Sequence, residues 1–239
     1  MPDRRRVASQ PRERAGTARV LRDETVKRYL ETIFYIQHEE RLVRPSRIAE
    51  WTSVSPATVS TTLRGLEAAG WARIGSDRSV KLTAAGQRMA EGIVRSHRLL
   101  ERWLADDLGL DWARADEEAQ NLAPVLSQAL ADRLDEHLGR PATCPHGNVI
   151  PGRDAPYGAL ISLADLQPGT SACVRRISEV AEHDAPDLLR LLQSSGVAIG
   201  TRVQVTGTRS TTGAVSVRAG RRSIAFGTEV ARSIWVETE

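Results

Sequence analysis

The sequence has little of several residue types, and each shortage excludes a class of protein. Only two cysteines occur, Cys144 and Cys173, which is no disulfide framework of the kind that stabilises small secreted domains. No apolar run approaches the roughly 20 residues that cross a bilayer. The Arg-rich N-terminus also lacks the apolar stretch of a secretory signal. These absences predict a cytoplasmic protein without a membrane segment.

An excess of charge of one sign is missing as well. The chain of 239 residues has 33 basic and 30 acidic residues, a net charge of +3, which does not by itself require a nucleic-acid partner. The distribution is uneven, however, because seven arginines crowd the first two dozen residues: Arg4, Arg5, Arg6, Arg12, Arg14, Arg19 and Arg22. We expect residues 1–24 to form a flexible arm that either contacts phosphates non-specifically or is a solvated tail.

Catalytic motifs are also absent. The sequence contains no Gly-rich phosphate loop, no nucleophile elbow and no His-Glu-x-x-His, and its few histidines are not arranged with a nucleophile. We therefore do not expect an enzyme.

The hydrophobic periodicity predicts an α+β chain of several units. Helical spacing begins at Thr25 and returns in 46–51, with Ser46 as N-cap, and again from Ser55 to a stop at Gly70. Segments 71–74 and 79–82 read as a hairpin, followed by a long helix over 83–104. A helical region over 112–138 should break near Pro124 or Ser127, and a Pro- and Gly-containing linker follows. Short β-type segments after residue 160, with one helix near 187–194, predict a small barrel.

Two helices joined by a short turn and followed by a hairpin define a winged helix-turn-helix. Apolar residues such as Val59, Leu63 and Leu66 would pack the second helix onto the first. The opposite face carries small hydroxyl, methyl and guanidinium groups that suit phosphates and base edges, and Arg78 would contact DNA from the wing tip. The candidate DNA-binding residues are Ser55, Ala57, Thr58, Ser60, Thr61, Arg64 and Arg78.

Several segments together resemble the diphtheria-toxin-repressor family of iron- and manganese-dependent regulators. They are RYLETIFYI, SPATVSTTLRGLEAAGW, SDRSVKLTAAG, RSHRLLERWLADDLGLDW and the linker TCPHGNVIPG. The tail segments ISLADLQPGTSACVRRISE, LLRLLQSSGVAIGTRVQV and AFGTEVARSIWVE are similar to the family's SH3-like domain, also found in ferrous-iron-transport accessory proteins. The resemblance covers residues 25–239.

The resemblance implies a domain organisation and a set of partners. It implies a winged helix-turn-helix over 25–91, a helical dimerisation and metal-site domain over 92–140, a linker over 141–159 and an SH3-like small β-barrel over 160–239. It also implies a homodimer that represses transcription by binding palindromic operators in double-stranded DNA, under control of Fe²⁺ or Mn²⁺.

The main metal site of the family is degraded in this sequence. Its first-helix ligand position is occupied by Arg28, and its Glu/Cys-x-x-Glu-His positions by Gln120, Ala123 and Pro124. Arginine, alanine and proline side chains do not ligate a cation, an amide is a weak ligand, and the guanidinium repels a positive ion. We predict that this main site does not bind metal.

An ancillary site is partly retained. His97 and Glu101 lie four residues apart on one helix face and match the family's ancillary ligands, and Asp116 replaces a histidine. Glu182 and His183 lie close to the positions from which the SH3-like domain supplies ligands. Such a set suits one divalent transition metal, Mn²⁺ or Fe²⁺, or else Co²⁺ or Zn²⁺. Cys144 and His146 form a Cys-x-His pair, but two ligands are too few for a structural zinc site, so we expect a rigid turn with an idle thiol.

Two mechanisms remain open at this point. The regulator is metal-independent, with Arg28 supplying a fixed positive charge that pairs with Glu31 or Asp116, or it responds to metal through the ancillary residues. The alternatives are a Mn²⁺- or Fe²⁺-dependent repressor of metal-homeostasis genes, and a protein-interaction module whose SH3-like domain binds a proline-rich segment.

Overall fold

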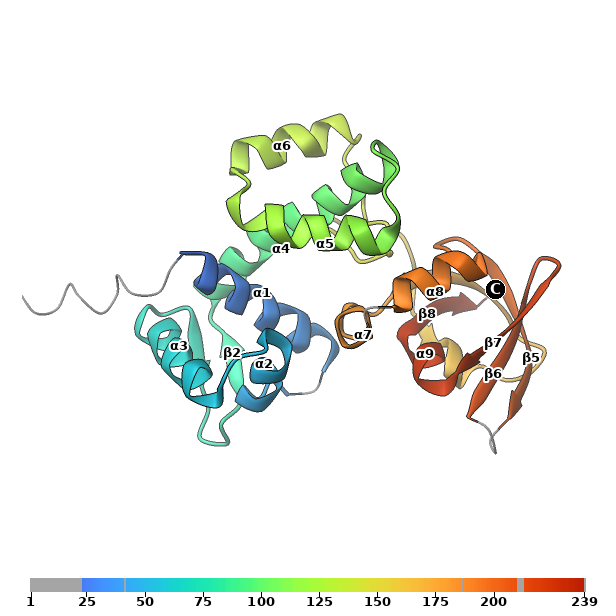
Figure 1. Cartoon of the computed structure of the whole chain (residues 1–239), viewed down its shortest axis with the longest axis horizontal. Helices are drawn as coiled ribbons and strands as arrows, with labels where there is room; N and C mark the ends of the chain where they lie inside the picture. Colours follow the sequence, from blue (N-terminus) through green and yellow to red (C-terminus); the bar gives the residue numbers. More distant parts are fainter. Residues whose placement is uncertain (1–22, 41, 186, 210–212, 239) are drawn as a thin grey trace, which may run out of the picture.

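The computed structural model describes residues 23–40, 42–185, 187–209 and 213–238. Figure 1 shows a winged helix, a group of helices and a barrel, with α7 between the winged helix and the barrel. This mixed architecture confirms the predicted fold class. The Arg-rich arm, expected over residues 1–24, lies outside the described residues except for its last two, which begin the first helix.

The winged helix is built from three helices and a two-stranded hairpin. Its elements are α1 (Asp23–Glu39), α2 (Pro45–Thr52), α3 (Pro56–Ala68), β1 (Ala72–Ile74) and β2 (Val80–Leu82). The side chain of Ser55 caps α3 by accepting a hydrogen bond from the Thr58 amide, as predicted. The prediction that Ser46 caps α2 is wrong, because Pro45 already occupies the first helical turn and Arg44 is the N-cap.

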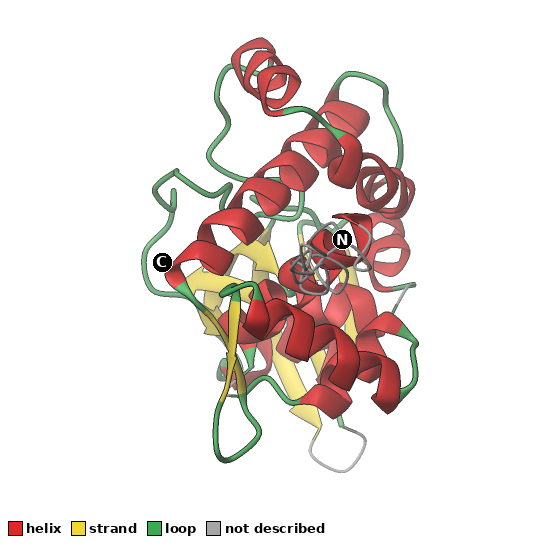
Figure 2. Cartoon of the chain, turned by 90° about the vertical axis from the view of Figure 1, so that its left-hand side faces the viewer, coloured by secondary structure: helices red, strands yellow, loops and turns green. Residues whose placement is uncertain are grey.

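One hydrophobic core holds the winged helix together. Its centre consists of fully buried side chains from all three helices: Leu30, Ile33, Ile36, Ile48, Val59, Leu63 and Leu66. The hairpin closes the core through Ala72 and Val80, which are 1% exposed. Because Val59, Leu63 and Leu66 are buried in this core, the opposite face of α3 is turned outward. Figure 2 shows the hairpin projecting beside α3.

A long helix joins this unit to the next. The helical elements are α4 (Ala84–Asp106), α5 (Trp112–Leu122), the 3-10 turn η1 (Ala123–Val125) and α6 (Gln128–His137). Helix α4 runs without a break across residues 91 and 92, where the DNA-binding and helical domains are expected to divide. The predicted interruption near Pro124 and Ser127 is confirmed, and Ser127 caps α6.

The C-terminal unit is a six-stranded antiparallel sheet with short helices around it. Its elements are β3 (Ile161–Ser162), η2 (Leu163–Asp165), β4 (Ser171–Ile177), α7 (Glu179–Asp184), α8 (Leu188–Ser195), β5 (Arg202–Arg209), β6 (Ala214–Ala219), β7 (Arg222–Gly227), α9 (Thr228–Ser233) and β8 (Ile234–Thr238). The strand order is β3-β8-β4-β5-β6-β7. The sequence predicted α8 to within a residue at each end but not α7 or α9, because six residues are too few to show a helical period.

Candidate metal centre and DNA-reading surface

The candidate metal centre is built around two polar residues on the buried face of α4. His97 and Glu101 lie one helical turn apart, and their exposed fractions are only 5% and 2%. Burying an ionisable side chain costs free energy unless it is paired with an opposite charge or a metal. Two such residues side by side therefore require partners from other elements.

The first set of partners comes from α1 and α5. His97 Nε2 lies 3.2 Å from Asp116 Oδ1 and 3.6 Å from Glu101 Oε1. On the other side of the ring, His97 Nδ1 lies 3.4 Å from Glu31 Oε1, which accepts a hydrogen bond from the Tyr35 hydroxyl. The structure thus brings together the three residues that the sequence singled out as a residual site, with ligand atoms of His97, Glu101 and Asp116 within 4.8 Å of one another.

The second set of partners comes from the linker and the barrel. Ligand atoms of Cys144 and His146 lie within 4.8 Å of one another and of a Glu101 oxygen. His146 Nδ1 lies 3.2 Å from Glu101 Oε1 and 3.3 Å from Glu182 Oε2, so Glu182 joins the same group. Glu101 is shared by both sets. We refer to the whole as the Glu101 cluster: His97, Glu101, Asp116, Cys144, His146 and Glu182.

A tight turn presents Cys144 and His146. The Cys144 amide donates to the Asn148 carbonyl, and the Gly147 amide donates to the Cys144 carbonyl. Gly147 has a φ of +84°, and a Cβ at this position would lie 2.0 Å from the carbonyl oxygen of Arg175. Only glycine therefore allows the turn to approach β4 so closely. Arg102 holds the other side of the turn by donating to the carbonyl of Cys144.

The ionisable groups of the cluster shift each other's proton affinities. Burial opposes ionisation of Glu101, but the imidazoles of His146 and His97 outweigh it and hold its pKa well below the usual range. For His146, burial favours the neutral ring, yet Glu182 and Glu101 raise its pKa well above 6.5. Burial raises the pKa of Glu182 to about 8, and burial together with Glu101 raises that of the Cys144 thiol to about 11. In the metal-free protein, protons thus supply the positive charge that the carboxylates require.

The cluster fits a metal ion by an independent criterion. His146 Nε2 and Glu182 Oε1 are buried and have no hydrogen-bond partner, while His97 Nδ1 and His146 Nδ1 face carboxylate oxygens at 3.2 to 3.4 Å without hydrogen-bond geometry. Buried polar atoms in folded proteins are nearly always satisfied, so several unsatisfied ligand atoms in one place indicate a missing partner. A cavity of about 410 Å³ lined by His97, Glu101, Asp116 and Glu182 leads from the surface to the cluster.

The two candidate ligands from α7 do not behave alike. Glu182 faces the cluster, whereas the ring of His183 stacks on Trp51 of α2 with 3.9 Å between ring centroids. The assignment of His183 as a ligand is therefore not supported by its contacts.

The residues aligned with the family's main-site ligands are Arg28, Gln120, Ala123 and Pro124, and of their side chains only the amide of Gln120 could ligate a metal, weakly. Arg28 and Gln120 are exposed, and Ala123 is buried at the end of α5. Arg28 forms no ion pair with any described residue, and the carboxylates of Glu31 and Asp116, its expected partners, are instead close to His97. The positively charged side chain that contacts one of these positions is Lys27, whose Nζ donates to the Pro124 carbonyl at 2.8 Å.

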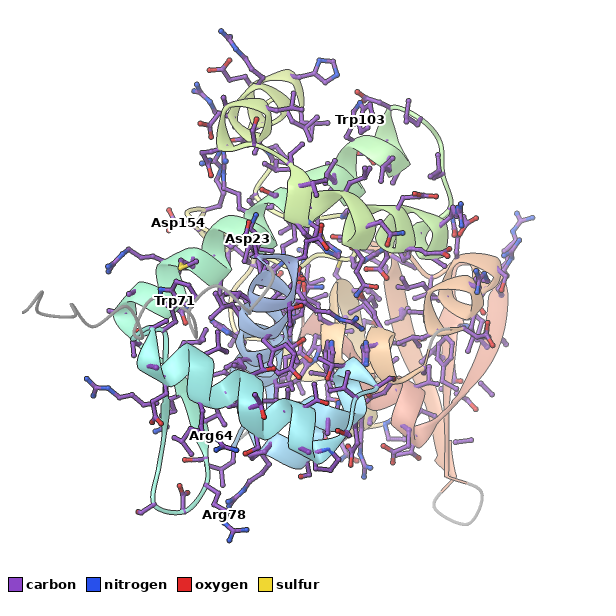
Figure 3. The ribbon with its side chains drawn as sticks, turned by 60° about the vertical axis from the view of Figure 1, so that its left-hand side comes forward. Asp23, Arg64, Trp71, Arg78, Trp103 and Asp154 are labelled. Carbon is purple, nitrogen blue, oxygen red and sulfur yellow. The ribbon has the colours of Figure 1, made fainter. Side chains whose placement is uncertain are left out.

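The predicted DNA-binding residues share one exposed surface. Ala57, Thr58, Ser60, Thr61 and Arg64 are all exposed on α3, opposite its buried stripe. Figure 3 shows Arg64 and Arg78 at the same end of the molecule, with Arg78 at the tip of the hairpin. Arg78 has a φ of +63°, and its amide donates to the Gly75 carbonyl, so the wing tip is a defined turn. Ser55 serves as the cap of α3, and Arg64 folds back onto Ser60.

Comparisons with known proteins agree with this geometry. Three family models match: "Iron dependent repressor, N-terminal DNA binding domain" over residues 23–80, "Iron dependent repressor, metal binding and dimerisation domain" over 83–152, and "FeoA domain" over 161–238. The iron-dependent repressor IdeR of Mycobacterium tuberculosis is 33% identical over 225 residues, which cover 90% of this chain and 97% of that protein. The diphtheria toxin repressor of Corynebacterium diphtheriae is 31% identical over 192 residues, 76% of this chain and 84% of that protein.

Solved structures give the same result. A manganese-dependent transcriptional repressor in complex with manganese has a TM-score of 0.81 and 32% identity, and covers 90% of this chain and 100% of its own. ScaR with bound Zn²⁺ has a TM-score of 0.75 and 25% identity over 90% of this chain and 99% of its own. The fold and the exposed α3 define a winged-helix DNA-binding transcriptional regulator. The chain belongs to the iron-dependent repressor family, whose members are metal-dependent repressors.

Two cluster residues escaped the sequence reasoning. Cys144 and His146 were expected to form an idle turn because a Cys-x-His pair offers too few ligands by itself. The structure places both, from a turn of the linker, beside Glu101 of α4. The available signal was the Gly147 that follows them, since a glycine-dependent turn next to two ligand-type residues favours a close approach to another element.

Among the described residues, no helix is both long enough and apolar enough to cross a membrane.

Proposed function

We propose that this protein is a homodimeric transcriptional repressor whose operator binding responds to a divalent transition metal held by the Glu101 cluster instead of the family's main site. One observation carries the proposal: the cluster gathers buried imidazoles and carboxylates, and His146 Nε2 and Glu182 Oε1 among them have no hydrogen-bond partner. The residues aligned with the main site are Arg28, Gln120, Ala123 and Pro124, of which only Gln120 has a side chain that could ligate a metal, and weakly. In this proposal, the Glu101 cluster is the site through which the protein responds to metal.

The donor chemistry supports this assignment. Two imidazoles, one thiol and three carboxylates suit Mn²⁺, Fe²⁺, Co²⁺ or Zn²⁺, whereas Mg²⁺ and Ca²⁺ prefer oxygen ligands alone. A bound cation would supply the positive charge that protons on His97 and His146 supply otherwise. Ligand protons are released as such a site fills. Because Glu101 belongs to both ligand groups, it is the residue on which the site depends most.

The surface of the helical unit supports dimerisation. Of the large hydrophobic residues that are exposed among those described, four lie in the segment from the end of α4 to α6: Leu108, Leu122, Val125 and Leu130. Val125 is 67% exposed, which is unfavourable for an apolar side chain in a monomer unless a partner covers it. A two-fold dimer would present two α3 helices to half-sites about one turn of DNA apart.

One contact favours the alternative, a repressor that needs no metal. Lys27 of α1 already binds the carbonyl of Pro124, so a fixed cation joins the first helix to the helical unit at the place of the lost main site. Under this alternative the dimer is competent for DNA binding at all times.

Binding to the protein's own promoter DNA separates the two functions. We expect weak binding in chelator and binding about 5- to 150-fold tighter with saturating Mn²⁺, Fe²⁺ or Zn²⁺, the usual range of coupling between sites. Fluorescence anisotropy at fixed salt measures both affinities, with a scrambled duplex as control. Tight binding in chelator that metal does not change would establish the metal-independent alternative.

The wing is expected to contribute through phosphate contact. Arg78→Ala should weaken binding to all sequences by a similar factor and lower the slope of log affinity against log salt by about 1. Arg232→Ala, which removes an exposed arginine of α9 that pairs with Glu229, is the matched control. A change in sequence preference without a change in the salt slope would assign Arg78 to base reading instead.

A further inference from the structure

Helix α7 lies between the winged helix and the barrel (Figure 1). Five of its six side chains contact residues outside the barrel: Glu179, Val180, Glu182, His183 and Asp184. It belongs to the barrel in sequence, yet Val180 packs against the hydrophobic core of the winged helix. Glu179 forms an ion pair with Arg98 of α4 at 2.7 Å. A helix of six residues has little stability of its own, so its position is set by these contacts.

The end of α1 holds the beginning of α7. The carboxylate of Glu39 accepts hydrogen bonds from the Ser178 hydroxyl and from the amides of Glu179 and Val180, at 3.1 and 3.4 Å for the two amides. Arg176 donates to the same carboxylate at 2.9 Å. A residue of the winged helix thus caps a helix of the barrel and satisfies its free amides.

The other end of α7 reaches α2, the first helix of the helix-turn-helix. The ring of His183 lies parallel to that of Trp51, with an interplanar angle of 0°. Asp184 Oδ2 lies 2.7 Å from Arg47 Nη2, and the guanidinium of Arg47 also covers the Trp51 ring and pairs with Glu40. Two neighbouring residues of α7 therefore contact two neighbouring turns of α2.

Glu182, the residue just before His183 and Asp184, faces the Glu101 cluster. Glu182 Oε2 lies 3.3 Å from His146, and Glu182 Oε1 is buried without a partner. A cation bound by Glu182 would hold α7 at the cluster, and the next two side chains of this helix rest on Trp51 and Arg47. At the positions aligned with the main site, by contrast, α1 and α5 offer only the exposed amide of Gln120, which is a weak ligand.

We propose that α7 couples the Glu101 cluster to the helix-turn-helix: a cation bound by Glu182 fixes α7, and His183 and Asp184 transmit that position to Trp51 and Arg47 of α2. This inference rests on the proposed function. The residues His183 and Asp184 are positioning residues, since they touch neither the cation nor DNA. Helix α2 in turn packs on α3, so its position sets the angle at which α3 enters the groove.

The test measures coupling and not binding alone. In the double variant His183→Ala/Asp184→Ala, metal affinity without DNA and operator affinity in chelator should each stay within about twofold of wild type, because no ligand or DNA contact is removed. The enhancement of operator affinity by saturating Zn²⁺ or Mn²⁺ should fall from the wild-type factor, typically about 5 to 150, to near 1. By linkage, operator DNA should raise metal affinity in the wild type by the same factor and not in the variant.

Matched variants exclude a merely structural effect. Asp187→Ala removes a carboxylate three residues further on that is 95% exposed and, among the described residues, pairs with Arg190 alone at 3.4 Å, so coupling should be unchanged. His183→Phe keeps a flat ring on Trp51 and should restore coupling where His183→Ala reduces it. Circular dichroism establishes that each variant is folded.

The outcomes distinguish the two proposals. A wild type that shows no metal enhancement overturns the proposed function, and the inference with it. A wild type that shows enhancement, together with a folded double variant that shows the same enhancement, overturns the role of α7 alone. Loss of coupling in the double variant, with rescue by His183→Phe, supports it.

Discussion

Replacing Glu101 by glutamine is expected to weaken metal binding by about 100-fold or more, since even outer residues that only support a ligand cost 10- to 100-fold when they are lost. Glu101 lies within 3.6 Å of both His97 and His146 and is common to both ligand groups. Glutamine has nearly the same shape but lacks the negative charge that stabilises a cation. Competition against a fluorescent metal indicator measures the change, and metal-dependent operator binding should disappear with it.

Glu117→Gln is the control for this substitution, because Glu117 lines the same cavity from outside the cluster and pairs with Arg114. Its metal affinity should equal that of the wild type. Asp116→Asn and Cys144→Ser then show which of the two ligand groups binds the metal, since Asp116 belongs to one group and Cys144 to the other. Wild-type metal affinity in Glu101→Gln would show that the cluster is an ion-pair network without a metal.

Replacing Arg98 by methionine is expected to destabilise the folded protein by about 3–5 kcal/mol, the usual cost of removing one partner of a buried ion pair. The guanidinium of Arg98 donates to both oxygens of Glu179 and to the carbonyl of Val149, and only 7% of the residue is exposed. Burial raises the pKa of Glu179, and Arg98 opposes that rise. Without Arg98 the buried carboxyl must either remain charged without its ion-pair partner or take up a proton.

Urea unfolding measures this difference, with the midpoint and slope fitted together. Arg133→Ala removes a pair on α6 whose side chains are 81% and 51% exposed, and it should leave the midpoint unchanged. The double variant Arg98→Met/Glu179→Gln should recover part of the loss, because no unpaired charge is left behind. A single variant as stable as the wild type would mean that water hydrates Glu179 in solution.

Local patterns were sufficient to predict the winged helix. The spacing of Val59, Leu63 and Leu66 set the buried face of α3, and the Ser55-Pro56 pair set its start. The same reasoning predicted that His97 and Glu101 share a helix face, because the period of a helix determines which side chains are neighbours. The assignment of α3 and Arg78 to DNA binding stays a prediction, supported by exposure.

Long-range contacts could not be predicted in this way. Cys144 and His146 reach Glu101 only because Gly147 lets their turn approach β4, about 30 residues further along the chain. Nothing in the sequence distinguished Glu182 from His183 as a candidate metal ligand. The structure separates them because Glu39 fixes the start of α7 and so decides which residue faces the cluster. One of the two mechanisms that the sequence left open pairs Arg28 with Glu31 or Asp116, whereas the structure has a different contact here, in which Lys27 donates to the Pro124 carbonyl.

The turn that carries Cys144 and His146 makes the metal centre sensitive to proteolysis of the chain between the turn and the barrel. The amide of Ile177 in β4 donates to the carbonyl of His146, so the barrel supports the turn from behind. The barrel contributes one side chain, Glu182, to the cluster itself. A cut in the chain just before β3 would leave the DNA-reading helices whole. It would also release this support, and the two linker ligands would lose their anchorage. Such a clipped protein would lose α7, α8 and α9 together with Glu182 but would keep the other five residues of the Glu101 cluster. Its response to metal should be weaker, so intact mass should be established before any sample is judged unresponsive.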